Sequence, residues 1–403
     1  MQTVTSTASS GEVSYDPVDP DLWRDPYPTY RRLRDESPVH YVRDKKFWVL
    51  SRFEDVFAAA TETDTFSSAQ GLTFTEDEIS KLGLAPTLVM MDRPSHTTYR
   101  RLVNQMFTPR QVSELEEAVR AFARERISRI AEAGEADLVA ELAGPLPSYV
   151  VAHYLGVPES DRGTFGAWSS AIVQANATGR VLEAVDALRD LYGYFTGLIE
   201  LRRATPAQDM ISVLLGEQID GRPLSVEEIL GFCFVMIAGG NDTASGLISQ
   251  AAAALSESAG QRKLLLDDPS LVPGAVEELL RFTSPVQGLS RTTTRDTEVG
   301  GTLIPAASKV HLLYASANRD PREFGPDSEN LDVTRRFPRM LAFSSGPHHC
   351  LGAAAARLEG RVVLEELLSA MPRFVADGAE GRYAPGPFTR RFEYLPIRSG
   401  ARG

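Results

Sequence analysis

The segment Phe343-Ser-Ser-Gly-Pro-His-His-Cys-Leu-Gly352 is the most informative part of the sequence, because it places a cysteine just before an alanine-rich helical pattern. A cysteine at the start of a helix lies near unpaired backbone N–H groups and the positive end of the helix dipole, and both favour the thiolate. Gly346 and Gly352 allow the backbone to approach something bulky and flat. One thiolate in such a loop suits an axial ligand of iron. Taken alone, the segment favours a buried structural cysteine at Cys350 over an iron ligand.

Other metal sites are poorly supported by the two cysteines, Cys233 and Cys350. The sequence has no C-x-x-C, so a four-ligand zinc site would need scattered histidines. The C-x-x-C-H attachment is also absent, so any haem would be held without thioether bonds. A cysteine-protease pair is not excluded, but nothing else supports it. One disulfide at most favours a reducing, cytoplasmic location.

A second signal lies inside the longest predicted helix, 225–257, which Ser225 and Glu228 could open with a capping box. Gly239 and Gly240 stand in its middle, where each should cost about 1 kcal/mol relative to alanine. Such a local conflict is typical of functional sites. The glycines could open a groove beside a flat ligand, and Asp242 and Thr243 could donate or relay protons. The alternative is a helix–helix crossing with a satisfied polar pair.

Two further pairs lie on predicted helices. Glu278 and Arg281 are three residues apart and therefore share a helix face. His96 and Arg100 are one turn apart and follow Asp92-Arg93-Pro94. For both pairs the local alternative is a solvated helix surface, where an ion pair contributes little.

The chain as a whole reads as one mostly helical domain, 1–403, with a minor β region. Net charge is −12, which argues against broad nucleic-acid binding. The longest near-apolar run, Ile229–Gly240, is too short for a membrane helix, which needs roughly 20 residues. The expected segments are a flexible polar lead-in (1–20), helices at 27–35 and 53–61, a hairpin at 39–51, an irregular stretch at 67–94, a helical region at 95–282, strands at 290–294, 297–304 and 309–313, and a helix after Cys350.

Together, the four signals in this order resemble the cytochrome P450 superfamily, the haem-thiolate monooxygenases, and within it the soluble bacterial, actinobacterial type. The resemblance extends from about Asp21 to Pro396. The pattern F-x-x-G-x-x-x-C-x-G is matched by Phe343, Gly346, Cys350 and Gly352, the pattern (A/G)-G-x-(D/E)-T by 239–243, and E-x-x-R by Glu278 and Arg281. The departures are mild. Ser344 stands where the family often has glycine, and Asp92-Arg93-Pro94 replaces the commoner Asp-Pro-Pro.

The resemblance implies a mainly α fold with a smaller β region, the triangular helical prism of the family, with haem b between the long central helix and the cysteine-loop helix. By position, Cys350 should be the iron's thiolate ligand and Phe343 should pack beside the sulfur. Thr243 should support protonation of the bound oxygen, with Asp242 as relay. The remaining cofactor-binding residues are His96, Arg100, Arg291 and His348 as propionate partners, with Gly239 and Gly352, and the structural network is Glu278, Arg281 and Arg335.

The resemblance also implies a mostly hydrophobic organic substrate oxidised with O2, and electrons from a ferredoxin and its NAD(P)H reductase. Expected substrate contacts are Leu88, Val89, Met90, Phe234, Val286 and Leu289, with Gln70, Gln174 and Gln287 as polar anchors. Arg101, Arg110, Arg336, Arg339 and Arg357 could form a basic patch for the ferredoxin. We expect a monomer that binds neither membrane nor nucleic acid. Two alternatives are a non-hydroxylating oxidation, such as coupling or peroxide-driven chemistry, and a non-catalytic haem-binding sensor.

Overall fold

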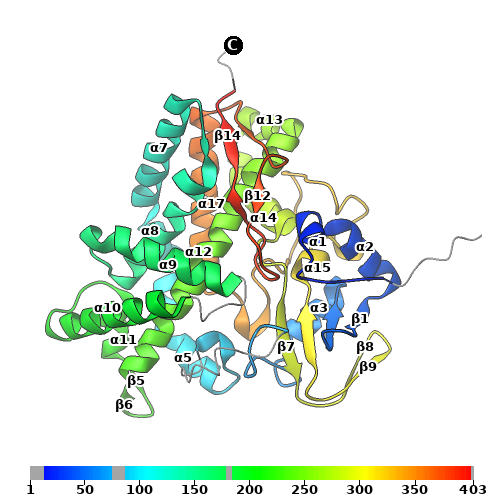
Figure 1. Ribbon diagram of the computed structural model, residues 1–403, viewed down its shortest axis with the longest axis horizontal. Coiled ribbons are helices and arrows are strands. Elements are labelled where there is room, and N and C mark those ends of the chain that lie inside the picture. Colours follow the sequence, from blue (N-terminus) through cyan, green and yellow to red (C-terminus); the bar gives the residue numbers. More distant parts are fainter. Residues whose placement is uncertain (1–12, 75–86, 178–183, 401–403) are drawn as a thin grey trace, which may run out of the picture.

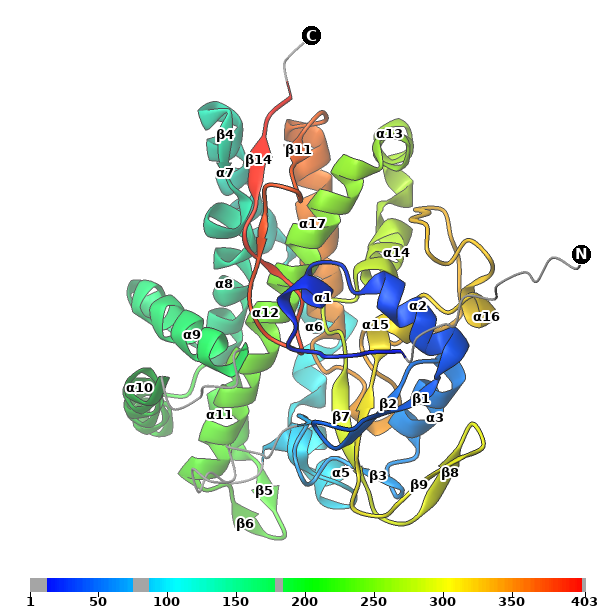
Figure 2. The same cartoon turned by 45° about the vertical axis from the view of Figure 1, so that its right-hand side comes forward.

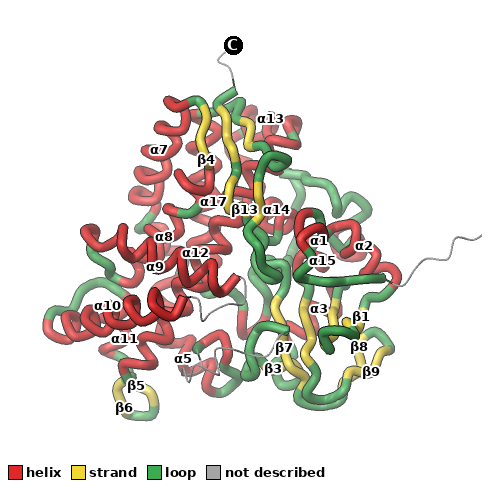
Figure 3. Tube along the Cα trace, in the orientation of Figure 1, coloured by secondary structure: helices red, strands yellow, loops and turns green. Residues whose placement is uncertain are grey.

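The computed structural model describes residues 13–74, 87–177 and 184–400. Figure 1 shows a broad, roughly triangular molecule, with helices over most of its area and a β region in one corner. In Figure 3 most strands lie in that corner or run from the C-terminal end toward the centre, and the β5–β6 hairpin lies apart from them beneath α11. The expected mainly α fold with a smaller β region is therefore confirmed. Within the described residues, no helix is both long and apolar enough to cross a membrane.

The helices follow the predicted order closely. Their bounds are α1 Pro20–Arg24, α2 Tyr27–Glu36, α3 Phe53–Thr61, α5 Ser95–Val103, α6 Pro109–Ser113, α7 Glu116–Ala133, α8 Pro145–Leu155, α9 Arg162–Ala177, α10 Val185–Ala204, α11 Met210–Gly216, α12 Val226–Glu257, α13 Ala259–Asp267, α14 Val272–Thr283, α15 Tyr314–Ala317, α16 Pro321–Phe324 and α17 Ala353–Ala370.

The main sheet has five strands in the order β1-β2-β10-β7-β3, with β2 and β10 parallel and the other neighbours antiparallel. Its strands are β1 Val39–Val42, β2 Phe47–Leu50, β3 Phe66–Ser67, β7 Leu289–Thr293 and β10 Lys309–Leu312. The smaller sheets contain β4 Glu135–Asp137, β5 Gln218–Ile219, β6 Arg222–Pro223, β8 Thr297–Val299, β9 Thr302–Ile304, β11 Val375–Ala376, β12 Arg382–Tyr383, β13 Phe392–Tyr394 and β14 Pro396–Arg398.

The long helix α12 organises the helical part of the molecule. The predicted capping box is present, because the Ser225 hydroxyl accepts from the Glu228 N–H and the Glu228 carboxylate accepts from the Ser225 N–H. From Ala244 to Leu255 every residue of α12 is buried. Figure 2 shows α12 running through the helical layer, with α8 and α17 close to it. This burial on all sides makes α12 the frame on which the other helices pack.

The N-terminal segment differs from the expected flexible lead-in. Residues 1–12 lie outside the described residues, but Val13 and Tyr15 are buried. The Tyr15 ring lies 6.3 Å from the ring of Tyr30 on α2, within an apolar cluster that includes Leu33. Polar composition suggested mobility over 1–20, whereas these two apolar side chains hold the segment against α2 from residue 13 onward.

A charged network lies buried at the end of α14. Glu278 and Arg281 are fully buried and paired at 2.7 Å, and the Arg335 Nε lies 3.3 Å from the Glu278 carboxylate. Arg281 also donates to the carbonyls of Asn318 and Ser328, at 2.7 and 2.9 Å. The Glu278–Arg281 pair is therefore no solvated surface pair. It joins α14 to the loops that lead toward the cysteine segment.

Replacing Glu278 with glutamine should lower the free energy of unfolding by about 3–5 kcal/mol, because it leaves the buried Arg281 charge uncompensated. Chemical denaturation followed by circular dichroism measures the change. The matched control is Glu36→Gln, which breaks the exposed Arg32–Glu36 pair one turn apart on α2 and should change little. An equal, small effect of both substitutions would contradict this role of the network.

Candidate functional site

The cysteine segment forms a tight loop between α3 and α17. The Cys350 N–H donates to the Phe343 carbonyl at 2.9 Å, which closes the loop. Gly346 has a φ of 69°, and a Cβ there would lie 3.0 Å from the Thr61 Cα on α3. Glycine is needed for both reasons. Ser344 also adopts a left-handed φ of 57°, and its hydroxyl lies 3.1 Å from the Tyr314 hydroxyl.

The Cys350 side chain is exposed, although the surrounding protein removes part of its water. That desolvation is the largest influence and raises the pKa of the Cys350 thiol, while the Gly352 N–H and the charges of Arg100 and Arg357 limit the rise. The Arg357 guanidinium also lies 4.6 Å from the centre of the Phe343 ring. An accessible sulfur that faces an N–H donor and two cations can bind a metal as the thiolate. This surrounding excludes the inert, buried cysteine considered above.

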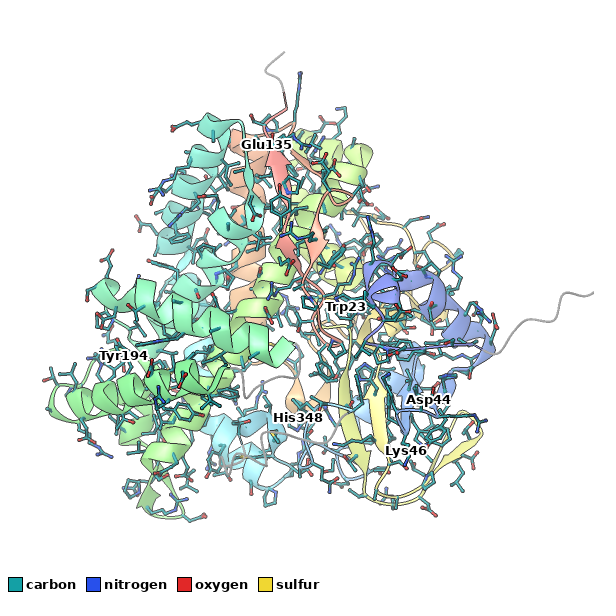
Figure 4. The ribbon with its side chains drawn as sticks, in the orientation of Figure 1. Trp23, Asp44, Lys46, Glu135, Tyr194 and His348 are labelled. Carbon is teal, nitrogen blue, oxygen red and sulfur yellow. The ribbon has the colours of Figure 1, made fainter. Side chains whose placement is uncertain are left out.

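Four side chains that can carry positive charge converge near this loop. His96 and Arg100 come from α5, Arg291 from β7, and His348 from the turn before Cys350. The rings of His96 and His348 are 4.2 Å apart. Figure 4 labels His348 in the region between α5 and β7. The structure thus groups all four residues that the sequence suggested as propionate partners.

Two of these four groups, His96 and Arg291, have hydrogen-bonding capacity that the described residues leave unused. The His96 Nε2 and Arg291 Nε atoms are buried without a partner. The Ser68 hydroxyl lies 3.2 Å from the His348 Nε2. In the described ranges, no carboxylate forms an ion pair with any of the four. Buried cationic donors without an acid are expensive. The cluster therefore fits an anionic ligand with buried carboxylates, as a haem has, beside a thiolate.

Mutual repulsion is visible in the pKa values of the two histidines. Burial, and after it the neighbouring Arg291, His96 and Arg100, together lower the pKa of His348 to about 3. Burial also lowers the pKa of His96, with Arg100 and Arg93 contributing. Both imidazoles are thus neutral donors at neutral pH, and the fixed positive charge of the cluster comes from Arg100 and Arg291.

The two glycines of α12 have different roles. A Cβ on Gly240 would lie 2.7 Å from the Val151 Cγ2, so Gly240 permits the crossing of α12 over α8. A Cβ on Gly239 would meet nothing within 4 Å, and Gly239 is exposed. The Thr243 hydroxyl donates to the Gly239 carbonyl at 2.8 Å. The helix-crossing interpretation therefore holds for Gly240, whereas Gly239 and Thr243 border open space.

Asp242 is buried and paired with Arg391, which comes from the C-terminal segment. Burial raises the pKa of Asp242 to about 6, and Arg391 limits the rise. Sequence analysis did not single out Arg391. The partners are 149 positions apart, and no local pattern links them.

Five of the six expected substrate contacts differ from Phe234 in where they lie. Leu88 lines a small cavity of about 10 Å³ with Tyr99, Gly231 and Phe232, near the start of α12. Val89 and Met90 are partly exposed, and Val286 and Leu289 are partly buried against the sheet core. Phe234 is different: nine residues at about 100° each place it on the face of α12 opposite Thr243. It is buried in the helical core, which corrects the expectation for Phe234.

The expected polar anchors also change. Gln287 is buried and already bonded, since it accepts from the Tyr30 hydroxyl at 3.0 Å and donates to the Ser284 carbonyl at 2.7 Å. These bonds make it a structural residue rather than a substrate anchor. Gln70 is exposed, and the side chain of Gln174 lies outside the described residues.

Two of the five arginines expected in a basic patch are neutralised by the protein itself. Arg339 pairs with Glu54 and Glu323, and Arg357 pairs with Glu277 at 2.6 Å. Arg101, Arg110 and Arg336 are exposed. The local positive charge is thus weaker than the sequence suggested.

Comparison with known proteins agrees with this site. The family model described as Cytochrome P450 matches residues 266–372. Cytochrome P450 130 of Mycobacterium tuberculosis is 50% identical over 94% of this chain and 96% of its own. A Vitamin D(3) 25-hydroxylase of Pseudonocardia autotrophica is 36% identical over 98% of both chains. The solved structure of cytochrome P450 CYP109Q5 from Chondromyces apiculatus superposes with a TM-score of 0.87, at 33% identity, over 96% of this chain and 98% of its own.

The family implies a haem with thiolate ligation, O2 and an organic substrate, and the cluster around Cys350 fits that group by its chemistry. The sequence similarity and the shared fold both extend over more than nine-tenths of this chain. The chain belongs to the cytochrome P450 family and is a P450 monooxygenase.

Proposed function

We propose that this monooxygenase inserts one oxygen atom from O2 into a mostly hydrophobic organic substrate, by hydroxylation or epoxidation. The observation that carries the proposal is the exposed Cys350 beside four donors that form no ion pair with a carboxylate of the described residues, two of them with a buried nitrogen left unpartnered there. We assign Cys350 as the thiolate ligand of a non-covalent haem b, and His96, Arg100, Arg291 and His348 as partners of its two propionates. Bound there, the haem would supply the activation of O2, which a thiolate ligand favours.

The chain's own residues then hold and move protons. We assign the Thr243 hydroxyl, fixed by its bond to the Gly239 carbonyl, as the group that would support protonation of the reacting oxygen. Asp242, one position earlier on α12, is the acid that resupplies protons from water. A carboxyl group whose pKa is near 6 can both accept and release a proton around neutral pH. Their presence supports use of O2 over peroxide and over a purely sensory role.

Leu88, Val89, Met90, Val286 and Leu289 supply an apolar lining with few polar groups, which suits a hydrophobic substrate. The related Vitamin D(3) 25-hydroxylase supports hydroxylation as the reaction. We further propose a ferredoxin and an NAD(P)H ferredoxin reductase as electron donors, because the described residues, 13–74, 87–177 and 184–400, all belong to the haem domain. The monomeric state and the cytoplasmic location stay predictions.

Replacing Cys350 with alanine should abolish the thiolate-type absorption spectrum of the reduced, CO-bound protein, because no other accessible thiol is present in the described chain. Absorption spectroscopy of protein purified with haem supplied measures this. Cys233→Ala is the control: Cys233 is buried in the core, so its loss should leave the spectrum unchanged. A thiolate-type spectrum in the Cys350→Ala variant would refute the assignment of the ligand.

Arg291→Met should weaken haem retention by about tenfold or more, since charge-assisted hydrogen bonds contribute about 1.5–3 kcal/mol each. The rate of haem transfer to apomyoglobin measures retention. Arg295→Gln, just beyond the end of β7, removes an arginine whose partner is the Thr65 hydroxyl and should leave the rate unchanged. Equal transfer rates for wild type and Arg291→Met would contradict the propionate role.

Thr243→Ala should lower the product formed per NADPH by about tenfold or more and release peroxide instead, because it removes the hydroxyl that supports protonation. The assay uses the compound that gives the largest high-spin shift in a ferric absorption titration with steroids, fatty acids, macrolides and small aromatics. Thr243→Ser keeps the hydroxyl and should retain most of the coupling. If Ser and Ala variants behave alike, the hydroxyl has no such part.

A further inference from the structure

A stripe of three residues on α12 holds the C-terminal segment of the chain. Asp242, Gly246 and Gln250 are spaced four apart and therefore share one face. A Cβ on Gly246 would lie 3.0 Å from both the Arg390 carbonyl oxygen and the Pro285 Cβ, so any larger residue would have to displace the C-terminal segment by a few tenths of an ångström. The Gln250 side chain donates to that same carbonyl at 2.7 Å and accepts from the Arg390 Nη1 at 2.8 Å.

The segment is fixed on its other side as well. The Arg390 guanidinium donates to the carbonyls of Trp23 and Arg24, at 3.1 and 2.7 Å, and the Arg390 N–H donates to the Pro285 carbonyl at 2.7 Å. Figure 4 labels Trp23 beside this C-terminal segment. The backbone at Arg390 is thus held from α12, α1 and the segment after α14, and this determines where the next side chain can reach.

That next side chain is Arg391, and its Nε donates to the Asp242 Oδ1. The two side chains are 14% and 8% exposed, so water screens their interaction little. A second guanidinium nitrogen lies 3.4 Å from the Phe392 carbonyl, which limits rotation of the group. In the described part of the chain, Arg391 is the charged group that ion-pairs with Asp242.

We propose that Arg391 is a positioning residue for Asp242: it holds the carboxylate ionised and oriented next to Thr243, and the contacts of Gly246 and Gln250 place it there. The proposal rests on the proposed function, in which Asp242 resupplies protons. It adds a part of the molecule, the C-terminal segment, that the proton pathway otherwise does not include.

The physical basis is a balance of burial against charge. Burial alone disfavours the carboxylate of Asp242, and the Arg391 charge opposes that effect, with a resulting pKa of about 6. Without the arginine, the pKa of Asp242 rises further, so the group stays protonated at neutral pH and cannot accept a proton from water. The orientation is lost as well, because Arg391 is the group that bonds the Oδ1 atom.

The test is an infrared pH titration of the ferric holoenzyme that follows the band of protonated carboxyl groups. The Asp242 component is the one that disappears in Asp242→Asn. We expect the midpoint of this component to rise in Arg391→Gln. In Arg391→Lys, which keeps the charge, the midpoint should lie between those of the wild type and Arg391→Gln. The matched control, Arg382→Gln, removes an exposed pair with Glu393 on the neighbouring strands and should leave the midpoint unchanged. An unchanged midpoint in Arg391→Gln overturns the proposal.

Gly246→Ala tests the placement without altering either charge. Its Cβ should push the Arg390 carbonyl away and raise the Asp242 midpoint in the same direction as Arg391→Gln. This variant and Arg391→Lys also keep the test valid if Arg391→Gln does not fold, as judged by circular dichroism. A folded Gly246→Ala variant with the wild-type midpoint would overturn the role given to Gly246.

A second readout separates this inference from the proposed function. NADPH consumption with ferredoxin and its reductase is measured across pH with no added organic substrate. We expect Arg391→Gln to slow consumption severalfold and the double variant with Asp242→Asn to be no slower than Asp242→Asn alone. If Asp242→Asn has no effect, the proton relay of the proposed function fails. If Asp242→Asn slows consumption but Arg391→Gln does not, only the inference about Arg391 fails.

Discussion

Positive charge that pairs with no carboxylate of the described residues, beside an exposed cysteine, is the constraint around which this site is built. Arg100 and Arg291 bring charge close to Cys350, and two neutral histidines add donors without adding charge. A protein that buried such a cluster for its own stability would place an acid within it, as the Glu278–Arg281–Arg335 network does. The contrast between these two arginine-rich clusters distinguishes a site made for an anionic ligand from a site made for the fold.

The helix α12 connects the two sides of the molecule because each of its faces has a separate task. Gly240 packs against Val151 of α8, while Gly239 and Thr243 border open space. The third face, with Asp242, Gly246 and Gln250, receives the C-terminal segment. These three glycines and the buried polar side chains of Asp242 and Gln250 would be destabilising in an isolated helix. Packing of its buried faces supplies the stability that helix propensity lacks here.

Local patterns predicted much of this structure, and nonlocal contacts were the part that they missed. The capping box of α12 and the hairpin before α3 depend on neighbouring residues, so sequence spacing was enough. Phe234 was misplaced because an apolar residue near a functional motif can face either way. Gln287 was misjudged because its partner, the Tyr30 hydroxyl, comes from the other end of the chain. The Asp242–Arg391 pair could not be found for the same reason.

Charge on the surface acts at shorter range than the net charge suggests. The chain carries −12, which would repel an acidic ferredoxin at low salt. At physiological ionic strength, charges more than about 8 Å apart are largely screened, so the local arrangement matters more. Arg339 and Arg357 form ion pairs with carboxylates of the protein itself, whereas Arg101 and Arg110 are exposed. Steering of the proposed donor therefore depends on a few arginines, such as Arg101 on α5 and Arg110 on α6. The helix α5 also supplies His96 and Arg100 to the site.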